Sequence, residues 1–372
     1  MTDSSSTDHL VIVDYNDLKQ ESSSQELLFK LEEAFGSSGK GVIGIRNVPE
    51  FVKAKDALLP LGHSLAKLPP AELTALEDPD SMFNAGWSHG KEKLKKDVPD
   101  LNKASFYFNP LVDVPGTPED RIKYPASYPS NKWPKTALPE LEPAAKNLGT
   151  ILKNVAVELS RHIDAYASSK NPKNYQPPTL LYDALKDTIK AKGRLLYYYP
   201  LSLDDQSSSQ EDSWIGWHND SGFLTCLAGD LYLDAATGTP VSPPEGAGLY
   251  ICNRKSEVCH VHLPADCIAI QIGECTEIVT GGAVQATPHC VRAAAAGSTT
   301  TPTSRVSLAC FIDTPPSFAL NAPKDTDLSE LLQEPTGKVP PLKDRWSPGQ
   351  TFGDFLATTF QMYYDWGNNK EE

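Results

Sequence analysis

The sequence predicts an α+β fold with a mainly β core, and two features of the chain lead to this class. After Lys192, short apolar runs broken by turns follow one another at close spacing, and about ten such runs are typical of a β-sandwich or jelly roll. Before that point helical and strand patterns alternate, and a helical pattern returns near the C-terminus. We therefore expect an N-terminal α/β and helical region at 1–185, a β core at 186–315, and a C-terminal loop and helix at 316–372.

The first part of the chain alternates between strand and helix patterns. A capping box, Ser23-x-x-Glu26, opens the first helix, and Gly36 ends it. Pro60 bends or interrupts the second helical pattern. The expected elements are a strand at 9–15, a helix at 23–35, a strand at 41–46 and a helix at 52–67.

Three further stretches complete the regions outside the core. Segment 69–139 is rich in Pro, Asp, Tyr and Trp with little periodicity, so we expect loops there. Within it, Trp87-Ser88-His89-Gly90 is a candidate cover for the mouth of the core, although ordinary loop packing explains it equally well. Apolar residues recur at helical spacing over 141–163, which predicts a supporting helix, and again over 351–366.

The core strands are expected wherever a short apolar run lies between turn residues. These strands are 194–199, 213–218, 224–228, 231–234, 248–253, 257–262, 267–272, 276–280, 284–289 and 305–313. The serine- and threonine-rich segments 204–212 and 293–303 are expected to be solvated surface loops.

Bulk composition narrows the classes of function. The net charge of -14 and the pI near 5.1 disfavour a nucleic-acid partner, because such a protein normally needs a basic face. No stretch has the roughly 20 apolar residues of a membrane span, and no targeting signal is visible. The seven cysteines form no Cys-x-x-Cys pair and have mostly apolar neighbours, which favours reduced thiols and a cytoplasmic protein.

Two histidines and an aspartate form a candidate metal site. His218 and Asp220 stand at i and i+2, and side chains at that spacing in an extended segment leave the same face. With His289 they would make a set of two histidines and one carboxylate, which leaves positions open on an iron ion for a cosubstrate and O₂. Taken alone, the aspartate could instead fix a histidine tautomer in a turn, and His289 could be an ordinary strand residue.

A candidate anion site follows in the last core strand. Arg305 and Ser307 are again at i and i+2, so a guanidinium and a hydroxyl could hold one carboxylate near the metal. The simpler alternatives are a surface cation and a strand serine. His260 and His262 also resemble a ligand pair, but no carboxylate is in register with them, which favours an exposed polar face.

These motifs together resemble the Fe(II)- and 2-oxoglutarate-dependent dioxygenase superfamily, and within it the branch similar to isopenicillin N synthase. The likeness is close over 194–313 and looser near 41–49. Four motifs carry it in the family's order: Tyr198-Tyr199-Pro200, His218-Asn219-Asp220, Ile272-Gly273-Glu274 and Arg305-Val306-Ser307. Two features depart from the family pattern, namely Tyr197, where relatives often have Asn, and a longer segment between His289 and Arg305.

The resemblance implies a double-stranded β-helix of the cupin-like kind, with iron at its open end. His218, Asp220 and His289 would be the iron ligands and the catalytic centre. Arg305, Ser307 and Tyr199 would hold the distal carboxylate of 2-oxoglutarate. The implied cofactors are Fe(II) and 2-oxoglutarate, with ascorbate as a further candidate, and the implied partners are O₂ and a small organic substrate.

The main hypothesis is an oxygenase that couples decarboxylation of 2-oxoglutarate to hydroxylation or desaturation of a metabolite, with release of succinate and CO₂. One alternative is an Fe(II) oxidase of the isopenicillin N synthase or ethylene-forming type, which uses no 2-oxoglutarate. Another is a catalytically silent jelly-roll binding protein. The sequence defines neither the substrate nor the oligomeric state, although Trp87, Lys91, Lys93 and Tyr107 are candidate substrate contacts.

Overall fold

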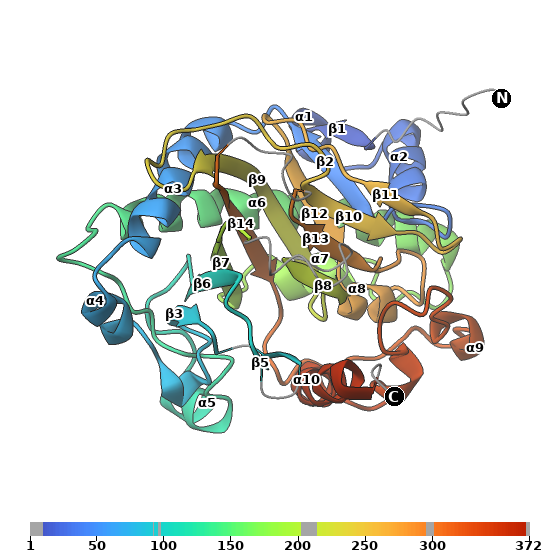
Figure 1. Cartoon of the computed structure of the whole chain (residues 1–372). Helices are drawn as coiled ribbons and strands as arrows, with labels where there is room; N and C mark the ends of the chain where they lie inside the picture. Colours follow the sequence, from blue (N-terminus) through green and yellow to red (C-terminus); the bar gives the residue numbers. More distant parts are fainter. Residues whose placement is uncertain (1–9, 92, 96–97, 202–213, 295–300, 370–372) are drawn as a thin grey trace.

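Two β-sheets form the centre of the protein (Figure 1). The structure is a computed structural model, and it describes residues 10–91, 93–95, 98–201, 214–294 and 301–369. The larger sheet has eight strands in the order β1-β2-β12-β9-β14-β7-β6-β3, and the smaller has four in the order β11-β10-β13-β8. The predicted α+β class is confirmed. Segment 204–212 and most of 293–303 lie outside the described residues.

The strands of the large sheet come from both halves of the chain. They are β1 (Ile12–Asp14), β2 (Val42–Arg46), β3 (Gly86–His89), β6 (Lys103–Phe108), β7 (Ala191–Tyr198), β9 (Leu224–Asp234), β12 (Ile268–Ile272) and β14 (Thr303–Ile312). The small sheet consists of β8 (Ile215–His218), β10 (Gly248–Cys252), β11 (Val258–His260) and β13 (His289–Arg292). A separate hairpin pairs β4 (Lys93–Lys95) with β5 (Val98–Pro99).

The helices lie around the sheets, and α9 and α10 lie at the end of the molecule opposite β1 (Figure 1). They are α1 (Tyr15–Leu18), α2 (Gln25–Phe35), α3 (Phe51–Ala66), α4 (Pro70–Ala75), α5 (Pro118–Lys123), α6 (Leu141–Lys170), α7 (Leu180–Leu185), α8 (Glu274–Val279), α9 (Leu328–Leu331) and α10 (Phe352–Asn369). Two short 3₁₀ turns cover Pro79–Ser81 and Leu342–Asp344.

The predicted N-terminal elements are confirmed with changes at their ends. Helix α2 begins one residue later than the capping box implied, because the side chain of Ser24 caps it by accepting a hydrogen bond from the amide of Leu27. Helix α3 runs through Pro60 without ending there. The prediction of loops over 69–139 was wrong in part, because β3 and β6 come from this segment and extend the large sheet beyond β7. Trp87 and His89 are therefore strand residues.

Three predictions within the core were also wrong. Segment 284–289, expected as a strand, is irregular as far as His289, where β13 begins. Segment 276–280, expected as a strand, forms the end of helix α8 and its C-cap Thr280, and the short apolar run of this helix is fully buried. The expected strands 224–228 and 231–234 form the single strand β9, which passes through Gly229 at a φ of 86°. The register between β9 and β14 shifts between Ser307 and Ala309, so the extra residue is absorbed by a bulge.

The large sheet is buried on both of its faces. On the outer face, apolar side chains of α6 such as Leu148, Leu152 and Val155 join one core cluster with the strands. Each such side chain contributes about 1.5–3 kcal/mol when fully buried. On the inner face, a smaller cluster that includes Leu196, Tyr198 and Val291 lies between the two sheets. This inner space is where the predicted site residues meet.

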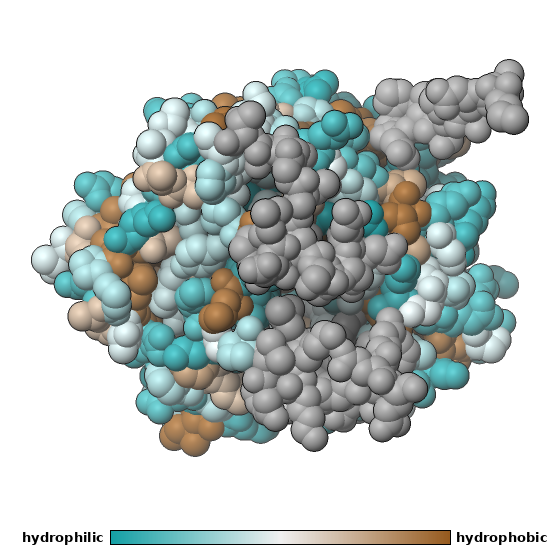
Figure 2. Space-filling model, in the orientation of Figure 1, coloured by the Kyte–Doolittle hydropathy of each residue, from teal (hydrophilic) through white to brown (hydrophobic). Residues whose placement is uncertain are grey.

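Among the residues that are coloured in Figure 2, hydrophilic ones predominate and apolar ones form small separate groups. Within the described segments, none of the helices combines the length and the apolar character needed to cross a bilayer.

Candidate metal centre and anion pocket

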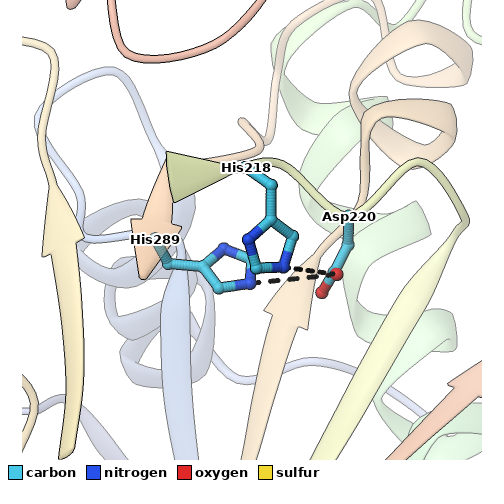
Figure 3. A group of neighbouring side chains, drawn as sticks. All are labelled: His218, Asp220 and His289. Carbon is cyan, nitrogen blue, oxygen red and sulfur yellow. Dashed lines mark ion pairs between the residues drawn. The ribbon is translucent and has the colours of Figure 1, made fainter. Parts of the chain in front are cut away.

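His218, Asp220 and His289 meet at one end of the space between the sheets (Figure 3). His218 ends β8 and His289 begins β13, and the two residues are paired across the small sheet. Asp220 lies in the turn just after β8. One ligand atom from each residue lies within 4.8 Å of the others, and Nε2 of His218 and of His289 are 3.9 and 3.8 Å from Oδ1 of Asp220. The structure therefore brings together the three residues that the sequence suggested as ligands of a single cation.

Backbone carbonyl groups orient both imidazoles toward the carboxylate. Nδ1 of His218 lies 2.9 Å from the carbonyl oxygen of Gly216, and Nδ1 of His289 lies 3.1 Å from that of Thr287. A proton on Nδ1 that is donated to a carbonyl leaves the Nε2 lone pair free for a metal. Desolvation and the neighbouring His289 lower the pKa of His218 to about 4, so its ring is neutral at pH 7.

The carboxylate of Asp220 fits a bound cation. The residue is 7% exposed, and its Oδ2 has no hydrogen-bond partner among the described residues. A buried carboxylate oxygen without a partner is unfavourable, and a metal ion would satisfy it. The donor set, two imidazoles and one carboxylate, suits Fe(II) with positions left for other ligands.

The loop that carries Asp220 is held by the C-terminal segment. The amide of Glu274 donates to the carbonyl of Asp220 over 2.8 Å, and Nδ2 of Asn219 donates to Oε1 of Glu274 over 3.0 Å. Arg345 makes two hydrogen bonds to the Glu274 carboxylate, of 2.6 and 2.5 Å, and a third of 2.9 Å to the carbonyl of Pro340. Sequence reasoning missed Arg345. The signal that could have indicated it is Glu274, because a carboxylate that follows a buried strand is stable there only with a cation beside it.

Arg305 occupies the other end of the same space. The residue is 4% exposed, its guanidinium lies 4.6 Å from the centre of the Tyr198 ring, and Nη2 donates to Oδ1 of Asp230 over 2.5 Å. Burial opposes its charge, but Asp230, Tyr198 and Tyr232 raise the pKa of Arg305 overall. Its Nε and Nη1 have no partner among the described residues, and Ser307 lines the same cavity. These unused donors suit a carboxylate ligand.

Tyr199 lies on the other side of the sheet from Arg305. Its ring stacks on His89 with centroids 4.9 Å apart and packs edge-on against Tyr197, also at 4.9 Å. Tyr198, which is paired with Arg305 across β7 and β14, lines the cavity in its place. Because side chains alternate along a strand, only one of two consecutive tyrosines can face the ligand. The geometry thus places Tyr198 where the sequence had indicated Tyr199.

His260 and His262 line the wall of the cavity, with ring centroids 4.3 Å apart. His260 also stacks on Tyr250 at 4.5 Å. Among the described residues, the metal-compatible group consists of His218, Asp220 and His289 alone, and it does not include this pair.

The cavity between the sheets has a volume of about 760 Å³. Its floor consists of side chains from β12, β9, β14 and β7 that lie side by side in four rows. The first row holds Gln271, Thr225 and Phe311, and the second holds Ala269, Leu227, Ala309 and Arg194. The third row holds Ser307, Leu196 and Asp230, and the fourth holds Arg305, Tyr198 and Tyr232. Because β12 ends at Ile272 and Glu274 binds the backbone of Asp220, the first row is the one nearest the metal ligands.

Comparison with known proteins gives matches at the level of structure. Neither a family model nor a curated protein matches the sequence. A Caulobacter crescentus protein assigned to the 2OG-Fe(II) oxygenase family is similar over 95% of this chain and 98% of its own, with a TM-score of 0.68 and 16% identity.

Two eukaryotic structures are similar over comparable lengths. Full-length Neurospora crassa T7H, crystallised with alpha-KG, matches 95% of this chain and 96% of its own at a TM-score of 0.66 and 17% identity. The rice dioxygenase for auxin oxidation matches 95% of both chains at a TM-score of 0.57 and 16% identity. The chain therefore has the fold that these oxygenases share.

Proposed function

We propose that the protein is a non-haem Fe(II)- and 2-oxoglutarate-dependent oxygenase that oxidises a small organic molecule. For a hydroxylation, substrate R–H, 2-oxoglutarate and O₂ would give R–OH, succinate and CO₂. The observation that carries this proposal is that one cavity contains both a cation-compatible triad and a buried arginine with unused donors. The two sheets around it would be the halves of a double-stranded β-helix.

The triad would hold the iron. His218 and His289 would offer ring nitrogens and Asp220 a carboxylate, so an Fe²⁺ ion bound by this set would keep about one net positive charge. When bound, Fe(II) supplies the redox chemistry with O₂ that oxidises the substrate. The residues of the chain fix its position and orient the two organic molecules.

The distal carboxylate of 2-oxoglutarate would bind at the fourth row. Arg305 offers its unused donors there, Ser307 a hydroxyl, and the rings of Tyr198 and Tyr232 close the sides. The burial of Arg305 excludes water, which strengthens each charge-assisted hydrogen bond. Such a site would select a diacid whose second end reaches the metal.

Related structures support a small-molecule substrate. Neurospora crassa T7H has been crystallised with alpha-KG and thymine, and JOX2 with 2OG, Fe and JA. Both have the same overall fold as this chain, with TM-scores of 0.65 and 0.61.

The test combines anaerobic Fe(II) titration with turnover of 2-oxoglutarate labelled at its C1 carboxylate. The wild-type protein should bind Fe(II) and release labelled CO₂ together with succinate. Asp220→Ala should weaken Fe(II) binding by more than about 100-fold and abolish turnover. Asp187→Ala, the same change at an exposed carboxylate, is the matched control and should resemble wild type.

Arg305→Met separates the two ligands. Loss of two charge-assisted hydrogen bonds, each worth about 1.5 kcal/mol or more, should raise the Kd for 2-oxoglutarate by about 100-fold, while Fe(II) binding persists. Iron binding without any turnover of 2-oxoglutarate in the wild type would instead favour an oxidase that needs no keto acid. Absence of iron binding would favour a silent jelly-roll protein.

A further inference from the structure

Gln271 is a buried amide that neither the metal nor the cosubstrate explains. It stands near the end of β12, is 2% exposed and lines the cavity. Its Oε1 has no hydrogen-bond partner among the described residues. A buried polar group without a partner destabilises a folded protein, so such a group in a cavity wall is expected to meet a ligand.

The other unpaired groups of the cavity already have proposed partners. Oδ2 of Asp220 would face the cation, and Nε and Nη1 of Arg305 would face the distal carboxylate. Gln271 lies in the first row, whereas Arg305 lies in the fourth. Along β14, Arg305 and Phe311 are six residues apart, so the first and fourth rows lie at opposite ends of the cavity floor.

The cosubstrate is short compared with this separation. Four carbon–carbon bonds of about 1.5 Å give 2-oxoglutarate a length of at most about 6 Å. A molecule held by Arg305 at its distal end and by the metal at its keto acid end would stay on the Arg305 side of the metal. The first row is then left to whatever else enters beside the metal, and in an oxygenase that is the organic substrate.

The chemistry of Gln271 defines what it would recognise. A side-chain amide offers one acceptor and two donors and carries no charge. Its complement is a neutral group with a donor beside an acceptor, as in a carboxamide, lactam or imide, whose N–H would donate to Oε1 while its carbonyl accepts from Nε2. Thr225, opposite Gln271 on β9, adds a hydroxyl to the same row, and Phe311 adds an apolar surface.

We infer that Gln271 is a specificity-determining residue, and that the substrate presents a carboxamide, lactam or imide group to the first row. This inference rests on the proposed function. A substrate lacking the N–H would leave Oε1 buried and unpaired, so the site should discriminate against N-methylated analogues by about 10- to 100-fold.

The first part of the test needs no substrate. In Gln271→Leu an apolar side chain of similar size replaces the unpaired amide, so the Tm of the full-length protein without substrate should rise by about 1 to 4 °C. Gln333→Leu, the same change at an exposed glutamine that does not line the cavity between the sheets, should leave Tm unchanged. A fall in Tm for Gln271→Leu would mean that the amide stabilises the fold and would count against the inference.

The second part measures substrate selection in the iron-loaded enzyme with 2-oxoglutarate. The probes are three pairs: uracil and 1,3-dimethyluracil, 2-piperidone and its N-methyl derivative, and benzamide and N,N-dimethylbenzamide. In the wild type, at least one N–H member should stimulate succinate release about tenfold or more over its methylated partner. In Gln271→Leu that ratio should fall to about one, because the amide that reads the N–H is gone.

The remaining outcomes separate this inference from the proposed function. Equal stimulation within every pair, stimulation by no probe, or a ratio that Gln271→Leu leaves unchanged would overturn the inference alone. A selective loss of 2-oxoglutarate affinity in Gln271→Leu would assign the amide to the cosubstrate and would also overturn it. If the wild type binds neither Fe(II) nor 2-oxoglutarate, the proposed function itself fails.

Discussion

Replacing Arg345 by methionine should destabilise the protein by about 3–5 kcal/mol, because it leaves a buried carboxylate without its cation. The Arg345 side chain has 0% and that of Glu274 has 2% of its surface exposed, and two hydrogen bonds of 2.5 and 2.6 Å join them. An unfolding entropy of about 2.1 cal/mol/K per residue over 372 residues amounts to about 0.8 kcal/mol/K, so Tm should fall by about 4 to 6 °C.

The same change should weaken the metal site. The Glu274 carboxylate accepts a hydrogen bond from Asn219, and the Glu274 amide donates to the carbonyl of Asp220. A Glu274 side chain that moves to find water would release Asn219, and the neighbouring metal ligand Asp220 would be disturbed with it. Loss of such an outer contact typically costs about 10- to 100-fold in metal affinity. Differential scanning calorimetry would measure the change in Tm, and anaerobic Fe(II) titration of the same samples would measure the affinity.

A double variant tests whether the uncompensated charge is the cause. Glu274→Gln combined with Arg345→Met removes both charges, so most of the lost stability should return even though the hydrogen bonds do not. If the single variant does not fold, the double variant still gives the comparison with wild type. A double variant no more stable than Arg345→Met, or a single variant with the Tm and iron affinity of wild type, would refute the reasoning.

Three other predictions follow from the site and the core. Asp230→Asn removes a partly exposed negative charge beside Arg305, so the affinity for 2-oxoglutarate should rise by about two- to fivefold. Anaerobic titration measures this affinity, and a loss of affinity would show that Asp230 mainly positions the guanidinium. Tyr198→Leu should weaken 2-oxoglutarate binding by about 2- to 30-fold, because the ring contact with Arg305 is lost, whereas Tyr199→Leu should leave this binding unchanged. The reverse result would assign cosubstrate binding to Tyr199. Burial raises the pKa of Asp164 from 3.8 to about 6, so the folded state holds this proton more tightly than the unfolded chain, and stability is lost as pH rises through that window. In urea unfolding, the stability of wild type relative to Asp164→Asn should therefore be greater at pH 4 than at pH 7, and an equal or opposite difference would contradict the assigned cause.

The part of the site that the sequence predicted is the part encoded by short spacings. His218 and Asp220 share a face because they are two residues apart, and the same holds for Arg305 and Ser307. The motif indicated Tyr199 as the cosubstrate contact, but its neighbour Tyr198 is the tyrosine that is paired with Arg305. A motif gives the order of residues and does not say which of two neighbours faces the cavity.

The contributions that sequence reasoning missed depend on contacts between distant segments. Arg345 meets Glu274 across 71 residues, and Gln271 matters only because burial leaves its amide unpaired. The fold shows the same division. The helices with long apolar periodicity were predicted, whereas β3 and β6 were hidden in a segment rich in proline and tryptophan, and the short apolar run of α8 fits either kind of element.

The order of strands in the large sheet bears on any attempt to isolate its central part. Strand β2 covers one edge of β12, and β6 covers the outer edge of β7, although both come from the region before residue 186. A fragment limited to 186–315 would leave two rows of backbone amides and carbonyls without partners. Such open edges recruit strands from other molecules, so the excised fragment should aggregate when the intact chain stays dispersed.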